Sequence, residues 1–167
     1  MLEMNKDFTK GENAMATENR IYGVGIVGAG WVSGEHIKAY ASNDNARVVG
    51  IYSRTAERAK AKLEECGVEG KVFSSFDELL ASPDIDIVSI CSPPSVHAEQ
   101  VIAAASAGKH IVIEKPVAMN IADVRKMQKA VQDAGVSTVV SFVLRWNPMF
   151  ETTKELLAAV AIAKLMY

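Results

Sequence analysis

Apolar runs rich in valine and isoleucine alternate along the chain with segments whose apolar residues recur every three or four positions. The runs predict buried strands, and the segments with the longer period predict amphipathic helices. The predicted strands cover residues 21–29, 47–53, 71–75, 84–92, 110–116 and 136–146. The predicted helices cover residues 33–43, 55–67, 76–82, 95–108, 120–135 and 148–160, and residues 163–167 are expected to start one further strand.

Strands that alternate with helices indicate a parallel sheet covered by helices on both faces. The predicted fold class is therefore α/β, with a doubly wound parallel sheet. Capping residues support both boundaries of two helices: Thr55 and Asn120 are suited to begin them, and Gly67 and Gly135 are suited to end them.

The composition and the net charge limit the classes of molecule that this protein is expected to bind. The chain has 167 residues, of which 49% are hydrophobic and 23% charged, and its formal net charge is −2. This balance gives no electrostatic reason to expect a nucleic acid or an anionic membrane as partner. No apolar run approaches the ~20 residues of a membrane helix. Cys66 and Cys91 show no metal or redox spacing, so we expect reduced thiols, a cytoplasmic location and no metal site.

A glycine-rich turn follows the first predicted strand and precedes the first helix. Its pattern is G-x-G-x-x-S, with Gly28 at the sharp turn, Gly30 where a pyrophosphate would approach, and Ser33 where the helix packs on the strand. The N–H groups of Trp31 and Val32 would face the ligand at the positive end of the helix dipole. The alternative is a purely structural turn, but this position favours dinucleotide binding by a Rossmann-like domain.

The end of the second strand should select the coenzyme. A carboxylate there would bind the ribose hydroxyls and repel a 2′-phosphate. This chain instead has Ser53 and Arg54, followed by Arg58 one helical turn later. A hydroxyl and two guanidinium groups suit a phosphate, so NADP is expected, with NAD as the alternative. The two arginines would have no such role if they are merely solvated.

Two further segments, "CSPPSVHAEQV" (91–101) and "VIEKPVAMN" (112–120), end strands on the same edge as the glycine turn. Ligands bind at that edge of open parallel sheets. A lysine at a partly desolvated site can have its pKa lowered toward neutrality, which suits Lys115 to proton transfer.

Four signatures in this order resemble the Gfo/Idh/MocA family, which groups glucose–fructose oxidoreductase, inositol dehydrogenase and related NAD(P)-dependent enzymes. They are G-x-G-x-x-S-x-x-H from Gly28 to His36, Pro-Pro-x-x-His ending at His97, Glu114-Lys115-Pro116, and "RWNP" at 145–148. The resemblance covers roughly residues 21–167.

The resemblance implies roles for individual residues. Lys115 resembles the family lysine that contacts the substrate hydroxyl near the nicotinamide, and the bond before Pro116 is expected to be cis. The residues that resemble those around the nicotinamide and its ribose are Ser92, Pro93, His97 and Glu114, with Arg145 and Trp146 at the floor of that half. A purely structural role stays open for His97, and a structural ion pair for Arg145.

Family members are about twice this length and carry a second α/β domain with the substrate pocket. We therefore expect a truncated protein or an isolated cofactor domain: a leader (1–19), a dinucleotide-binding domain (20–147), and a helix with the start of the second domain (148–167). The implied activity is hydride transfer to or from a secondary alcohol or ketone of a sugar or polyol, with little turnover by this chain alone and a homo-oligomer as its assembly. The alternative is a non-catalytic dinucleotide-binding or sensor module.

Overall fold

The computed structural model describes residues 20–159, apart from the side chains at positions 145, 146, 158 and 159. The expected leader and the strand expected at 163–167 lie outside these residues. Six strands form one parallel sheet in the order β3-β2-β1-β4-β5-β6. They are β1 (Tyr22–Val27), β2 (Ala46–Tyr52), β3 (Lys71–Phe73), β4 (Ile87–Ile90), β5 (His110–Glu114) and β6 (Thr138–Ser141).

Helices alternate with the strands, so the predicted doubly wound α/β fold is confirmed. They are α1 (Trp31–Ala41), α2 (Ala56–Cys66), α3 (Phe76–Ala81), α4 (His97–Ser106), α5 (Ile121–Ala134) and α6 (Pro148–Ala159), with the 3-10 turns η1 (Pro94–Val96) and η2 (Val143–Trp146). Each predicted helix is present, and η1 supplies the first turn of the helix expected at 95–108.

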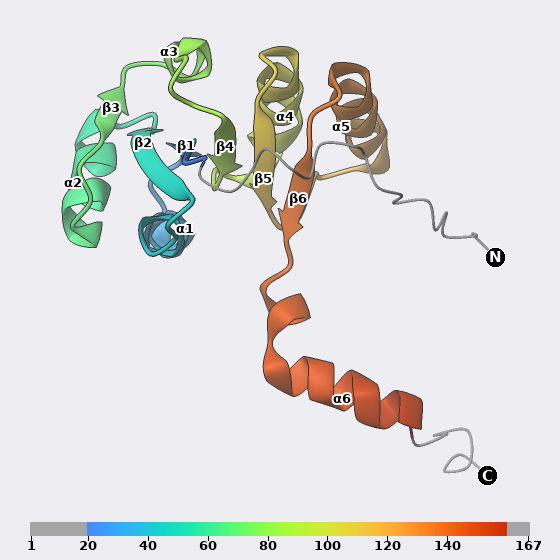
Figure 1. Ribbon diagram of the computed structural model, residues 1–167. Helices are drawn as coiled ribbons and strands as arrows, with labels where there is room; N and C mark the ends of the chain where they lie inside the picture. The colour runs from blue at the N-terminus through green and yellow to red at the C-terminus, as the bar shows by residue number, and fades with distance from the viewer. Residues whose placement is uncertain (1–19, 160–167) are drawn as a thin grey trace.

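Helices cover both faces of the sheet (Figure 1). The sheet therefore separates two apolar cores. On one face, Val24 and Ile26 of β1 pack with Ile37 of α1 and with residues of α2. On the other face, Val27 of the same strand packs with residues of α3, α4 and α5. Successive side chains of a strand point to opposite faces, and β1 is covered on both, which explains its almost continuous apolar sequence.

Strand order reverses between β1 and β4, which are hydrogen-bonded neighbours at the centre of the sheet. The chain leaves β1 for α1 on one face, and it leaves β4 for α4 on the other. The loops after these two strands therefore diverge, which opens a crevice at the carboxyl ends of the strands. We call this side of the molecule the carboxyl edge.

The predicted N-terminal cap is present in α5, but in α2 the capping hydrogen bond is missing. The Asn120 side chain accepts a hydrogen bond from the Asp123 N–H (2.9 Å), which confirms its capping role. Thr55 occupies the N-cap position of α2, but its side chain makes no capping hydrogen bond, so that prediction is only half right. Gly67 and Gly135 both end their helices in the left-handed region, as predicted.

The sixth strand is shorter than the sequence predicts. A strand was expected over residues 136–146, but β6 ends at Ser141 and the chain turns into η2. From there α6 runs away from the sheet (Figure 1). The continuous apolar sequence here is not that of a buried strand, because Phe142, Val143 and Leu144 are exposed.

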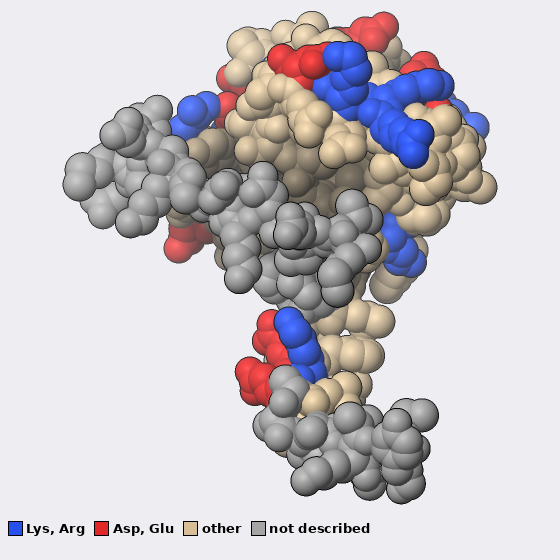
Figure 2. All heavy atoms as spheres, turned by 90° about the vertical axis from the view of Figure 1, so that its right-hand side faces the viewer, with Lys and Arg blue, Asp and Glu red and all other residues tan. Residues whose placement is uncertain are grey.

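Charges of both signs lie side by side on the face that contains α5 (Figure 2). Lys126 pairs with Asp123 (3.2 Å), and Lys129 pairs with Asp133 (2.8 Å). These pairs lie at helical spacing on the solvent side of α5, where water screens them, so they contribute little to stability.

The difference between the two caps predicts a difference in stability. Asn120→Ala should lower the free energy of unfolding by about 1 kcal/mol, because the Asp123 N–H loses its acceptor. Thr55→Ala is the matched control, and it should have much less effect because no capping bond is lost. Urea unfolding followed by circular dichroism measures both. Equal losses for the two variants would contradict the assignment.

Candidate functional site at the carboxyl edge of the sheet

The glycine turn, residues 28–30, connects β1 to α1. Gly28 has φ of +102°, and a Cβ on it would lie 2.7 Å from the Cys91 carbonyl oxygen, so only glycine fits there. Its N–H donates to the Tyr52 carbonyl (2.8 Å). The chain turns sharply at Gly28, as its sequence predicts, and the turn is held between the ends of β2 and β4.

Gly30 is the N-cap residue of α1 and leaves the helix N-terminus open. It has no side chain to cap the helix, and a Cβ built on it would meet nothing within 4 Å. Ser33 is fully buried, and its hydroxyl donates to the Gly30 carbonyl (2.7 Å). The first N–H groups of α1, including those of Trp31 and Val32, have no intrahelical acceptors, which makes this end suited to an anion.

A cleft of about 590 Å³ lies against this turn at the carboxyl edge. It is lined by residues from the ends of β1, β2 and β4 and from α2, α3 and α4. The sequence-predicted residues among them are Gly28, Gly30, Ser53, Arg54, Arg58, Ser92 and Pro93. Seven predicted residues therefore meet in one cleft, although they span 66 positions of the sequence from 28 to 93.

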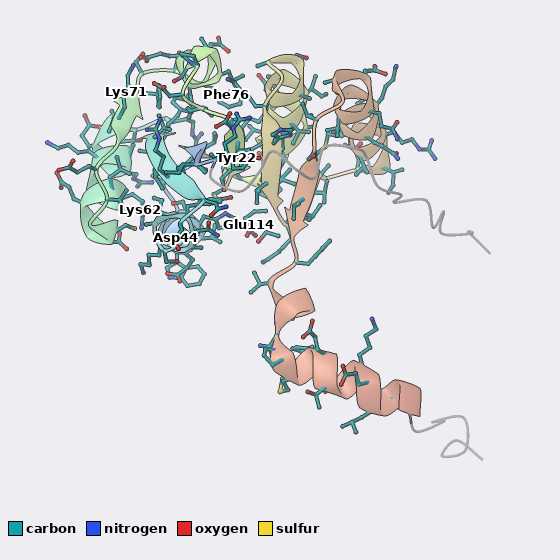
Figure 3. All side chains as sticks on the ribbon, viewed as in Figure 1. Tyr22, Asp44, Lys62, Lys71, Phe76 and Glu114 are labelled. Atoms are coloured by element: carbon teal, nitrogen blue, oxygen red, sulfur yellow. The ribbon has the colours of Figure 1, made fainter. Side chains whose placement is uncertain are left out.

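One end of the cleft carries an aromatic pair and two cations. The rings of Tyr52 and Phe76 stack with their centroids 6.2 Å apart (Phe76 is labelled in Figure 3). Arg54 and Arg58 are exposed and line the cleft beside Ser53. Sequence reasoning missed the aromatic pair. The sequence signal that could have indicated this pair is an aromatic residue at the end of the second strand and another at the start of the third helix.

The loop after β4 is held by a buried histidine. His97 is completely buried, with Nε2 2.9 Å from the Ser92 carbonyl oxygen and Nδ1 3.0 Å from the Pro116 carbonyl oxygen. A neutral imidazole has one N–H, so only the protonated ring donates to both carbonyls. His97 does not line the cleft. It connects the loops that follow β4 and β5, which is the structural role that the sequence left open.

Glu114 and Lys115 lie at the end of β5, on the same edge but beyond the cleft lining. The Lys115 side chain is exposed, and the Lys115–Pro116 bond is cis, as the resemblance implied. Glu114 is buried, and its carboxylate accepts the Lys115 N–H (3.1 Å). Arg145 and Trp146 belong to η2, and their side chains lie outside the described residues.

The structure adds lining residues that the sequence did not single out. Besides the aromatic pair they include Cys91, Glu99 and Gln100, and Gln100 accepts a hydrogen bond from the Ser92 hydroxyl. Burial raises the pKa of the Cys91 thiol to about 12, so it is a neutral wall of the cleft at ordinary pH.

Comparison with known families agrees with this geometry. The model of the oxidoreductase family with an NAD-binding Rossmann fold, Gfo/Idh/MocA, matches residues 22–142. The chain belongs to the Gfo/Idh/MocA family. It is similar over this range to the NAD-binding Rossmann domain of these oxidoreductases.

Relatives include enzymes of sugar and cyclitol chemistry. The chain is 38% identical over 112 residues to a 1,5-anhydro-D-fructose reductase of Ensifer adhaerens, which covers 67% of this chain and 33% of that protein. It is similar to the structure of the WlbA dehydrogenase of Bordetella pertussis in complex with NADH and UDP-GlcNAcA (33% identity, TM-score 0.77, 84% of this chain and 42% of that one). Scyllo-inositol dehydrogenase of Lactobacillus casei with NAD(H) and scyllo-inositol gives 28% identity, TM-score 0.77, and coverage of 86% and 42%.

The chain thus spans between a third and a half of the length of these relatives. Within residues 20–159, no group of three or more His, Cys, Asp or Glu side chains is arranged to hold a metal ion. Nor does any helix in that range combine the length and the apolar composition needed to cross a membrane.

The two glycines of the turn should differ in their tolerance of a methyl group. Gly28→Ala should lower the free energy of unfolding by about 2 kcal/mol or more, because the new Cβ is strained by the positive φ and meets Cys91. Gly30→Ala should cost less than about 1 kcal/mol, because its Cβ projects into open space. Thermal and urea unfolding measure the pair, and a larger loss for Gly30→Ala would refute this account of the turn.

Proposed function

We propose that this chain binds NADP and forms the coenzyme half of an oxidoreductase acting on a secondary alcohol or ketone of a sugar, a polyol or a related compound. The observation that carries the proposal is the open N-terminus of α1, where Gly30 leaves the first helical N–H groups facing a cleft. Family membership supports the same class of ligand.

The pyrophosphate of the coenzyme would bind at the glycine turn. Backbone N–H groups and the helix dipole both favour negative charge there. Gly28 cannot carry a side chain without meeting the backbone of Cys91, and a side chain on Gly30 would occupy the cleft. The turn itself explains the glycine at position 28, whereas nothing in the described structure prevents a side chain at position 30, so the bare backbone at Gly30 supports a close ligand.

The adenosine half would lie toward the end of β2. Ser53 stands where a carboxylate would select NAD, and Arg54 and Arg58 bring two guanidinium groups to the cleft. These groups support NADP for this chain, although the structures of two relatives contain NADH or NAD(H). NAD is the alternative.

The nicotinamide half would lie toward β5, and the nicotinamide itself supplies the hydride chemistry when bound. Lys115 would exchange a proton with the substrate oxygen, since its exposed side chain accepts the hydroxyl proton as the amine and returns it as the ammonium. We assign contacts in this half to Ser92, Pro93, Glu114, Arg145 and Trp146. His97 would act on it indirectly, through the loops whose carbonyls it contacts.

The family and the surface support proposals for the substrate and the assembly. Two relatives are described with a sugar derivative or an inositol, which supports a polyhydroxylated substrate for the whole protein, while turnover by this chain alone would be slight. Exposed apolar residues on β6, η2 and α6, among them Val139, Phe150 and Leu156, support the predicted homo-oligomer. The cytoplasmic location stays a prediction.

A bulky side chain at Gly30 tests the phosphate site. Gly30→Val should weaken dinucleotide binding by about 100-fold, because it displaces a ligand held by two or more charge-assisted hydrogen bonds. Calorimetric titration with NADP and NAD measures the loss, and unfolding without ligand should be little changed. Ala134→Val, an exposed position on α5, is the control. Unaltered affinity in Gly30→Val would rule out a pyrophosphate at this turn.

Arg54 tests the choice of coenzyme. The wild-type chain should bind NADP more tightly than NAD. Arg54→Ala should weaken NADP binding by about 10-fold or more, through loss of a guanidinium–phosphate contact, and should leave NAD binding almost unchanged. Arg125→Ala, an exposed arginine on α5, is the matched control. Tighter binding of NAD by the wild-type chain would decide against NADP.

A further inference from the structure

A buried carboxylate lies directly before the candidate catalytic lysine. Glu114 ends β5 and is 5% exposed (labelled in Figure 3). Burial of an ionised carboxylate is strongly unfavourable unless hydrogen-bond donors replace the lost water. Glu114 has a donor for each oxygen: Oε1 lies 3.0 Å from His36 Nε2, and Oε2 accepts the Lys115 N–H.

His36 comes from a different part of the fold. It lies in the second turn of α1, and its side chain is 12% exposed. Its Nδ1 lies 2.8 Å from the hydroxyl of Ser89, a fully buried residue of β4. A carboxylate only accepts, so Nε2 carries the proton toward Glu114, and in a neutral ring Nδ1 accepts from Ser89. One tautomer therefore satisfies all three side chains.

The surroundings favour the ionised form of Glu114. Burial by itself would raise the pKa of this carboxyl, but hydrogen bonds from Ser141, His36 and the Lys115 N–H outweigh it, and the pKa is lowered from its usual value. Tyr40 and Cys91 are the other titratable groups nearby, and burial raises the pKa of both. Both stay neutral at ordinary pH, so the charge of Glu114 is supported by Ser141, His36 and the Lys115 N–H.

We propose that His36 is a positioning residue that fixes Lys115 relative to the glycine turn. The link runs from α1 through His36 and the Glu114 carboxylate to the Lys115 backbone. This inference rests on the proposed function, since α1 would hold the pyrophosphate and Lys115 would lie beside the nicotinamide. The link sets the separation of the two sites across the sheet.

A packing role alone does not account for this arrangement. An apolar side chain would fill the space under α1, as Ile37 does on the same helix. It would also remove one of the donors that compensate for the burial of the Glu114 carboxylate. The His36 ring meets hydrogen-bond partners on two strands, β4 and β5, at both of its nitrogens.

Two substitutions separate positioning from packing. In His36→Gln the amide nitrogen reaches the place of Nε2 and can still donate to Glu114. In His36→Asn the amide reaches only the place of Nδ1, so the contact with Ser89 can persist while the one with Glu114 is lost. Each variant is titrated with the reduced coenzyme that the wild-type chain binds, NADPH or NADH, followed by nicotinamide fluorescence. Each is also titrated calorimetrically with the matching fragment that lacks nicotinamide, 2′-phospho-ADP-ribose or ADP-ribose.

We expect His36→Asn to weaken binding of the reduced coenzyme by about 10-fold, because Lys115 is no longer held in the position that suits the nicotinamide half. Its affinity for the fragment should stay within about 2-fold of wild type, because the glycine turn is untouched. His36→Gln should resemble wild type with both ligands. Glu114→Gln is the second variant: it removes the charge and one of the two acceptors, and should repeat the His36→Asn pattern.

Equal affinities for the Asn and Gln variants, or equal losses with coenzyme and fragment, would overturn the proposal and leave His36 as a packing residue. Failure of His36→Asn to fold leaves the decision to Glu114→Gln, which must then weaken the coenzyme and not the fragment. A wild-type chain that binds neither ligand would refute the proposed function, and this inference with it.

Discussion

The hydrogen-bonded pairing of β1 with β4 is the constraint on which the site depends. It places strands from two halves of the chain side by side, while their helices leave to opposite faces. The loops after them must separate, and the crevice between them receives the backbone of the glycine turn. Gly28 lies so close to the Cys91 backbone that no Cβ fits between them, so the two walls of this crevice are packed against each other here.

Patterns that act over a few residues could be read from the sequence. Local sterics and hydrogen bonding explain the central strands, the glycine turn and the Asn120 cap. Each of these is present as predicted. Prediction was poorer where solvent exposure decides the structure. The apolar run after Ser141 has the composition of a buried strand, yet it forms a turn, because nothing within the described residues covers it. Thr55 shows the same limit, since a residue type suited to capping does not ensure the bond.

Contacts between residues far apart in the chain could not be predicted from the sequence. His36 and Glu114 are 78 positions apart, and each appears in the sequence only as one polar residue of a motif. Ser89 gave a local signal, because it is a polar residue inside a buried strand and therefore needed a partner. The sequence did not identify that partner. The cleft residues Tyr52 and Phe76 were missed for the same reason, since their stacking exists only once β2 and α3 are placed.

Two histidines with different surroundings hold the segment around Lys115. His36 presents one N–H to a carboxylate, so its neutral form satisfies its neighbours, whereas His97 faces two carbonyl oxygens and donates to both only when protonated. Polar contacts of this kind have directions, unlike the apolar contacts of the two cores. The cores therefore hold the layers together, while the imidazoles determine where the backbone next to Lys115 lies. Placing a lysine at the edge of a packed sheet requires both, because apolar packing tolerates small shifts that hydrogen bonds do not.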